Sequence, residues 1–168
     1  MLLSAINHYQ QDFDLLLSYL SNFTNQNGLM CWQQVLPEGT TTIIPTPDPP
    51  GAGMTSATDG DLDIAHALLI ASEKWTHRPD SKGMAVPADY KQRALKIMDS
   101  IWKHTVNDKL KSLYLGDWVS PTDAKYSNVT RVSDFNLLAI YTFAKYDKSH
   151  NWTALLDNLI SILYQLFD

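Results

Sequence analysis

Three aspartates, Asp59, Asp61 and Asp63, stand at alternate positions directly before a stretch that is mostly apolar. Carboxylates accept hydrogen bonds from hydroxyl groups, hold cations, or act as acids and bases. A helix N-terminus favours one or two acids, because they complement the positive end of the helix dipole. Three like charges repel one another. The cluster therefore indicates that at least one acid serves chemistry or binds a polar ligand.

The same acids also have a structural interpretation. Thr58, Asp59 or Asp61 can each accept hydrogen bonds from the free amides of a first helical turn. For Asp61 and Asp63 this interpretation is as strong as the functional one. His66 lies three positions after Asp63 on the same helix face. A lone histidine there is more often a core or supporting group than a catalyst.

Metal sites and nucleic-acid binding find little support in the sequence. A calcium-binding EF-hand is excluded, because Ile64 replaces the required glycine and Ile70 the required glutamate. The single cysteine, Cys31, allows no disulfide within the chain and no thiolate metal site. A formal net charge of −5 and the lack of a lysine and arginine cluster argue against a nucleic-acid surface. We expect no metal and no cofactor.

The elements that position these acids are helical. Apolar spacing predicts five helical segments in one domain spanning residues 1–168: 2–23 with a break at 7–11, 61–75, 88–105, 134–146 and 152–167. Prolines and glycines predict a long surface loop at about 36–56, preceded by a short extended piece at 30–35. No strand alternation is sustained, so the predicted fold class is all-α.

The termini carry no recognisable targeting signal, and no stretch is long and apolar enough to span a bilayer. The first ten residues lack a basic region followed by an apolar one, so they do not resemble a signal peptide. We therefore expect no membrane-embedded segment.

Five tryptophans divide into two groups. Trp75, Trp102 and Trp152 fall within apolar helical patterns, which predicts core packing. Trp32 and Trp118 fall in loops, where core packing and ligand binding are equally open. An exposed indole offers a flat apolar face to a sugar ring, and its N–H can donate a hydrogen bond.

Residues 57–75, ATDGDLDIAHALLIASEKW, resemble the signature of glycoside hydrolase family 8. Three further segments are similar to that family: NGLMCW at 27–32, LGDW at 115–118 and TRVSDF at 130–135. In the last of these, Arg131 and Asp134 either form an ion pair or reach the groove. The family holds endo-acting β-1,4-glucanases, xylanases, lichenases and chitosanases.

The resemblance implies part of an (α/α)6 barrel, with substrate in a groove formed by loops at one end. It implies a secreted enzyme that hydrolyses a β-1,4-linked polysaccharide, glucan by default, with inversion. Asp59 matches the family aspartate that contacts the sugar at the cleavage point, and is the predicted catalytic-site residue. Trp32, Trp118 and Asp61 are the predicted substrate-binding residues.

The sequence departs from the family pattern at the catalytic pair. The family's general acid is a glutamate in a Ser-Glu-Gly/Ser-x-Gly-Tyr-Gly motif, and none of these residues form one. By resemblance it would lie just before Met1, and the general base would fall after Asp168. The alternative reading is a truncated, inactive carbohydrate-binding or vestigial protein. Helices of a partial ring also leave unpaired faces, which predicts a homodimer.

Overall fold

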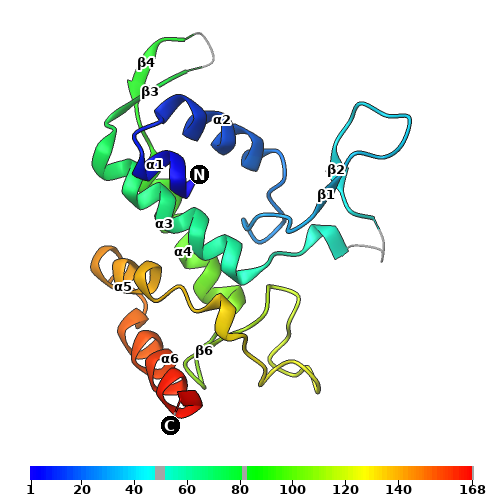
Figure 1. Cartoon of the computed structure of the whole chain (residues 1–168), viewed down its shortest axis with the longest axis vertical. Coiled ribbons are helices and arrows are strands. Elements are labelled where there is room, and N and C mark those ends of the chain that lie inside the picture. The colour runs from blue at the N-terminus through cyan, green and yellow to red at the C-terminus, as the bar shows by residue number, and fades with distance from the viewer. Residues whose placement is uncertain (48–51, 81–82, 168) are drawn as a thin grey trace.

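The structure is a computed structural model that describes residues 1–47, 52–80 and 83–167. The described residues form six α-helices and three short hairpins (Figure 1). The helices are α1 (Leu2–Ile6), α2 (Gln10–Ser21), α3 (Thr58–Lys74), α4 (Tyr90–Thr105), α5 (Leu137–Tyr146) and α6 (Trp152–Phe167). The predicted break in the first segment is confirmed. It falls at Asn7–Tyr9, where His8 has a positive φ of 65°.

Helix α3 lies at the centre of the molecule. Most of its side chains are buried, on several sides of the helix, which is typical of a helix packed on several faces. It contacts α1, α4 and α5. The outer helices are amphipathic instead: α4 buries one stripe, spaced three or four residues apart, made of Tyr90, Ala94, Met98, Ile101 and Thr105.

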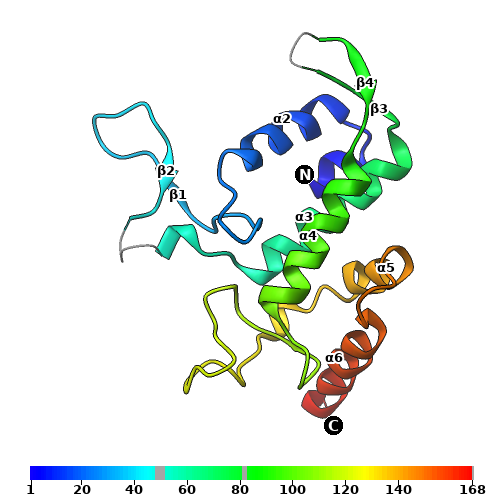
Figure 2. The same cartoon turned by 180° about the vertical axis from the view of Figure 1, so that it is seen from behind.

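The helices form two layers. In one, α3 contacts α1 on one side and α5 on the other. In the second, α2 packs on α1, α4 on α3 and α6 on α5. Figure 2 shows α4 beside α3 and α6 beside α5 from the second side. Three successive inner–outer helix pairs are the arrangement of a partial (α/α)6 barrel, as expected.

Three antiparallel hairpins join the helices, and the sequence predicted only the first of their strands, which lies within the extended piece expected at 30–35. They pair β1 (Gln34–Val35) with β2 (Ile44–Pro45), β3 (His77–Pro79) with β4 (Ala85–Pro87), and β5 (Val106–Asn107) with β6 (Ser112–Leu113). Two or three residues per strand are too few to leave an alternating pattern. The predicted loop at 36–56 contains β2 and the 3₁₀ turn Ala52–Met54; its residues 48–51 lie outside the described residues.

The core contains the aromatic residues that the helical patterns predict. Trp152 is fully buried and packs edge-on against Phe143 and Trp102. Trp75 packs edge-on against Phe13. The core prediction is confirmed for Trp152, while Trp75 and Trp102 are partly buried and pack against the core.

Large apolar side chains also remain exposed on helices near both ends of the chain. They are Leu3 and Ile6 on α1, Leu15, Leu16 and Tyr19 on α2, Leu138 and Tyr141 on α5, and Tyr164 and Leu166 on α6. Such faces are the expected edges of a barrel segment.

Candidate functional site

The first turn of α3 brings the aspartate cluster to one end of the helix pair α3–α4. Its N-cap is Ala57, which has no capping side chain. Of the three side chains expected to accept from first-turn amides, Asp59 does so, because its Oδ1 accepts from the Gly60 N–H at 2.9 Å. The Thr58 hydroxyl instead donates to the Tyr114 carbonyl at 2.7 Å, because the chain following β6 lies against this turn. Asp59 stays exposed.

Two adjoining cavities lie at this end of α3, and we call them together the groove. The first has a volume of about 350 Å³ and is lined by Asp59, Asp61, Asp63 and Trp32, among others. The second, of about 190 Å³, is lined by Trp118 and by Arg131, among others. Trp32 and Ala57 line both cavities, so the two lie side by side. The structure thus brings together all four residues predicted for the site.

The two loop tryptophans differ from the others in exposure. Trp32 is 52% exposed and Trp118 is 43% exposed, whereas Trp152 is fully buried. The Trp118 ring packs edge-on against Tyr126 at a centroid distance of 5.1 Å, which fixes its orientation. The groove therefore has flat apolar surfaces beside an exposed carboxylate.

Asp61 lies in the groove wall, with only 2% of its surface exposed. Its Oδ1 accepts a hydrogen bond from the Met30 backbone N–H at 3.2 Å, and its buried Oδ2 has no partner among the described residues. Burial raises the pKa of Asp61 to about 7, while the nearby Ser56 hydroxyl and the Met30 N–H oppose the rise. Asp61 joins the Met30 segment to α3 and contributes little polar surface to the groove.

The other acids around the groove are held by partners. The Asn136 amide donates to Asp63 at 2.7 Å, and its Oδ1 caps α5 by accepting from the Ala139 N–H at 3.0 Å. Buried Asp134 accepts from Arg131 at 3.1 Å. Both alternatives for the Arg131–Asp134 pair are realised, since they form an ion pair and Arg131 lines the second cavity.

His66 lies on the buried side of α3, away from the groove surface. His66 is 6% exposed, and burial lowers its pKa, so the imidazole is neutral near pH 7. Within the described ranges, no three histidine, cysteine or acidic side chains come together as metal ligands would. His66 is a core residue.

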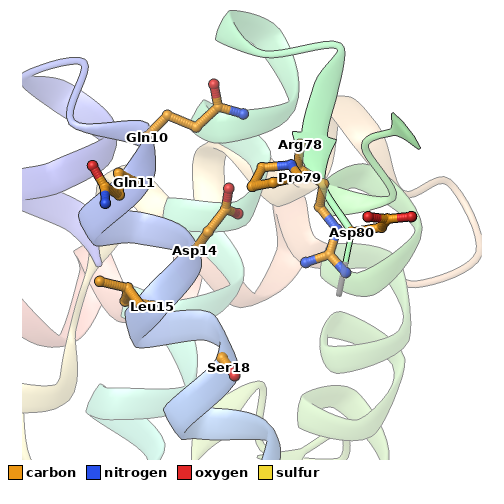
Figure 3. Close-up of a pocket in the computed structure, with 8 residues that line it drawn as sticks. All are labelled: Gln10, Gln11, Asp14, Leu15, Ser18, Arg78, Pro79 and Asp80. Atoms are coloured by element: carbon orange, nitrogen blue, oxygen red, sulfur yellow. The ribbon is translucent and has the colours of Figure 1, made fainter. Parts of the chain in front are cut away.

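A larger cavity, of about 710 Å³, lies between α2 and the β3 segment. We call it the crevice. In Figure 3, Gln10 and Asp14 of α2 and Arg78 of β3 lie around this space. It has no exposed tryptophan and none of the residues that the sequence singled out. Because β3 follows the C-terminal end of α3, the crevice lies at the opposite end of that helix from Asp59.

Sequence reasoning missed one residue beside the groove. Asp117 is half-buried and accepts hydrogen bonds from Asn25, Asn27 and Ser56. Of the Gly116-Asp117-Trp118 turn, only the tryptophan was predicted to belong to the site. The available signal was the position of Asp117 between a glycine typical of tight turns and a tryptophan predicted to bind substrate.

Comparison with known proteins agrees over almost the whole chain. The family described as Glycosyl hydrolases family 8 matches residues 1–166. The chain is 35% identical over 115 residues to a beta-glucanase from Niallia circulans, covering 68% of this chain and 26% of that protein. It is 31% identical over 169 residues to endoglucanase C from Ruminiclostridium cellulolyticum, covering 100% of this chain and 31% of that protein. The chain thus spans about a quarter to a third of these relatives.

The fold is also similar to that of a solved structure, endoglucanase Cel10 from Klebsiella pneumoniae, described as a family 8 glycosyl hydrolase. The TM-score is 0.72 at 23% identity, covering 98% of this chain and 47% of that one. No helix in the described residues has the length and apolar character needed to cross a bilayer. The family match, together with an all-α fold that forms part of an (α/α)6 barrel, shows that this chain belongs to glycoside hydrolase family 8.

Proposed function

We propose that the groove binds a β-1,4-linked glucan, and that this chain forms the sugar-binding part of an inverting glycosidase. One observation carries the proposal. Asp59 is exposed on the first turn of α3, in a groove that also contains the exposed tryptophans Trp32 and Trp118. Carbohydrate recognition needs this combination, since sugars present hydroxyl groups at their edges and apolar C–H groups on their faces.

Each group has a separate role in this proposal. An ionised Asp59 accepts hydrogen bonds from sugar hydroxyls and stabilises positive charge that develops on the ring during cleavage. Trp32 and Trp118 hold neighbouring sugar rings by contact with their flat faces. Asp61 supports the groove from beneath, because its carboxyl group is almost wholly buried.

Hydrolysis with inversion requires two carboxyl groups about 6.5–9.5 Å apart, one as general acid and one as general base. In the groove, Asp61 is buried and Asp63 accepts a hydrogen bond from the Asn136 amide. Among the described residues that line the groove, Asp59 is therefore the exposed acid that is not held by another side chain. The two glutamates lie elsewhere: Glu38 is in the loop after β1, and Glu73 accepts from the Tyr146 hydroxyl.

This arrangement favours a second candidate function, carbohydrate binding without turnover by these residues alone. A positioned acid or base contributes about 10²–10⁴-fold to the rate. In this candidate function, full turnover needs a catalytic pair beyond the acids that line the groove in the described residues. The polymeric nature of the substrate further supports action outside the cell, which we include in the proposal.

The test measures binding and turnover on the same preparations. Isothermal calorimetry with cellohexaose and reducing-sugar release from carboxymethyl-cellulose are compared for the wild type, Asp59→Asn and Trp118→Ala. Two exposed positions outside the groove serve as matched controls, Asp12→Asn on α2 and Tyr164→Ala on α6.

We expect the wild type to bind cellohexaose with little sugar release. Asp59→Asn and Trp118→Ala should each weaken binding about tenfold, as expected for loss of roughly 1.4 kcal/mol. The controls should bind as the wild type does. No binding by the wild type would reject the proposal. Rapid turnover that Asp59→Asn abolishes would instead make Asp59 itself a catalytic acid or base.

A further inference from the structure

The carboxylate of Asp117 is the acceptor for three donors at the side of the groove. Its Oδ1 accepts from the Ser56 backbone N–H at 2.8 Å. Its Oδ2 accepts from the side-chain amides of Asn25 at 2.7 Å and Asn27 at 2.8 Å. Asn25 and Asn27 are about ninety residues away in sequence, and Ser56 is 61 residues away.

These donors belong to the segments that carry the groove residues. Ser56 directly precedes the N-cap of α3 and hence the turn with Asp59. Asn25 and Asn27 belong to the turn that leads into Trp32, and Trp118 is the next residue after Asp117. One carboxylate therefore joins three loops that each supply one wall of the groove.

The local geometry leaves little freedom at this junction. The Asn25 Oδ1 accepts from the backbone N–H groups of Asn27 at 3.0 Å and Leu29 at 3.1 Å, so its Nδ2 must face Asp117. A Cβ added at Gly116 would lie 2.2 Å from the Ser56 carbonyl oxygen, so only glycine allows this approach of the two loops. Two acceptor oxygens meeting three donors require a carboxylate, because an amide would turn a donor toward a donor.

We propose that Asp117 is a positioning residue that holds Asp59, Trp32 and Trp118 in the relative arrangement needed to bind sugar. The inference deepens the proposed function and rests on it. Asp117 acts through the backbone and the two asparagines, without touching the ligand. Its loss lets the three loops move apart while the helices beneath them remain packed.

The test replaces Asp117 and then restores the lost complementarity. In Asp117→Asn, the new amide cannot accept all three hydrogen bonds. In the double variant Asn25→Asp/Asp117→Asn, the carboxylate at position 25 accepts from one N–H of the new amide and still accepts from the Asn27 and Leu29 backbone N–H groups, while the Asn27 side chain turns its Oδ1 to accept from the other. Asp123→Asn is the matched control in the same loop, because Asp123 accepts from Lys125 and Tyr126 through Oδ1 alone.

Binding of cellohexaose by the full chain is measured by calorimetry. Asp117→Asn should weaken binding at least tenfold, the double variant should recover to within about threefold of the wild type, and Asp123→Asn should bind normally. Unchanged binding by Asp117→Asn, or failure of the double variant to recover it, would overturn the inference. If Asp117→Asn does not fold, Asn27→Ala removes one of the three donors and should weaken binding about threefold; unchanged binding would again overturn it.

A second readout separates this inference from the proposed function. Hydrogen exchange follows the amide of Ser56, which is protected by Asp117 in the wild type. Faster exchange in Asp117→Asn, reversed in the double variant, supports the junction even if no variant binds cellohexaose, in which case only the proposed function fails. If the Ser56 amide of Asp117→Asn exchanged at the wild-type rate, the junction would be rejected, whether or not the variants bind cellohexaose.

Discussion

The groove and the crevice lie at opposite ends of α3. The crevice is the larger cavity, but exposed tryptophans beside a carboxylate line only the groove. The crevice has about 710 Å³ against about 350 and 190 Å³ for the two parts of the groove. Two of its charged side chains, Asp14 and Arg78, are held by residues outside the lining. Tyr90 donates to the Asp14 Oδ1 at 2.6 Å, and Arg78 pairs with Asp89 at 3.5 Å.

The groove has the reverse arrangement. Its supporting acids, Asp61 and Asp117, bind backbone and amide groups beneath or beside the surface, while Asp59 and the two tryptophans stay exposed. Polar groups satisfied within the protein stabilise the fold, whereas exposed groups held by such supports are available to a ligand. We propose the groove as the binding site on the arrangement of its hydrogen bonds more than on cavity volume.

The sharpest test of this contrast is the pH dependence of stability. Asp61 has a pKa of about 7 in the fold against 3.8 unfolded, chiefly because of burial. Between these values the fold binds a proton that the unfolded chain has released, so the contribution of Asp61 is full below pH 4 and is lost as pH rises through 7. Since one pKa unit corresponds to about 1.4 kcal/mol, the loss is at most about 4 kcal/mol.

Asp89, beside the crevice, should behave in the opposite sense. Burial raises its pKa, but the hydrogen bond and charge of Arg93 outweigh this and lower it below 3.8. Its contribution is present above pH 4 and is lost as pH falls further. Urea unfolding from pH 3 to 8 should show Asp61→Asn removing the decline toward pH 8, and Asp89→Asn reducing only the acid-side loss. If the stability of Asp61→Asn fell toward pH 8 as steeply as that of the wild type, the proposed difference between Asp61 and Asp89 would be wrong.

A second prediction uses two glycines of the groove. In Gly116→Ala the added Cβ meets the Ser56 carbonyl oxygen at 2.2 Å, so the loops must shift, at a cost of about 1–3 kcal/mol. In Gly60→Ala nothing lies within 4 Å, and a helical alanine should stabilise by about 0.5–1 kcal/mol. Urea midpoints should therefore move in opposite directions. Equal small effects would mean that the loop junction is loose.

The sequence predicted the helices and the groove residues for identifiable reasons. Apolar spacing placed α4 and α6 to within a few residues, because each buries one regular stripe. It placed the start of α3 at residue 61, whereas α3 begins at Thr58, because the N-cap Ala57 has no capping side chain and the Thr58 hydroxyl is held by the distant Tyr114 carbonyl. A contact with a distant loop leaves no local pattern.

The roles of the acids were harder to predict than their presence. Asp59 and Asp61 look equivalent in the sequence, yet one is exposed and the other 2% exposed, because two positions along a helix turn a side chain to another face. The significance of Asp117 depends on Asn25, Asn27 and Ser56, which approach it only in the fold. Long-range hydrogen bonds of this kind are the part of the site that spacing alone does not reveal.

The smallest predicted effect tests the structural nature of the crevice. Tyr90→Phe removes the hydroxyl that donates to Asp14, in a residue that is otherwise fully buried. Loss of this hydrogen bond should lower the free energy of unfolding by about 1 kcal/mol. Binding of cellohexaose should stay unchanged, because the groove lies at the other end of α3.

Tyr164→Phe is the matched control for that variant, since Tyr164 is 69% exposed on α6. It should change neither the urea midpoint nor the calorimetric affinity. If Tyr90→Phe weakened sugar binding as much as it weakened the fold, the crevice would be coupled to the groove through α3, and the two ends would act as one site. If it changed stability alone, the hydrogen bonds of the crevice would serve the fold, and binding would depend on the far end of the helix.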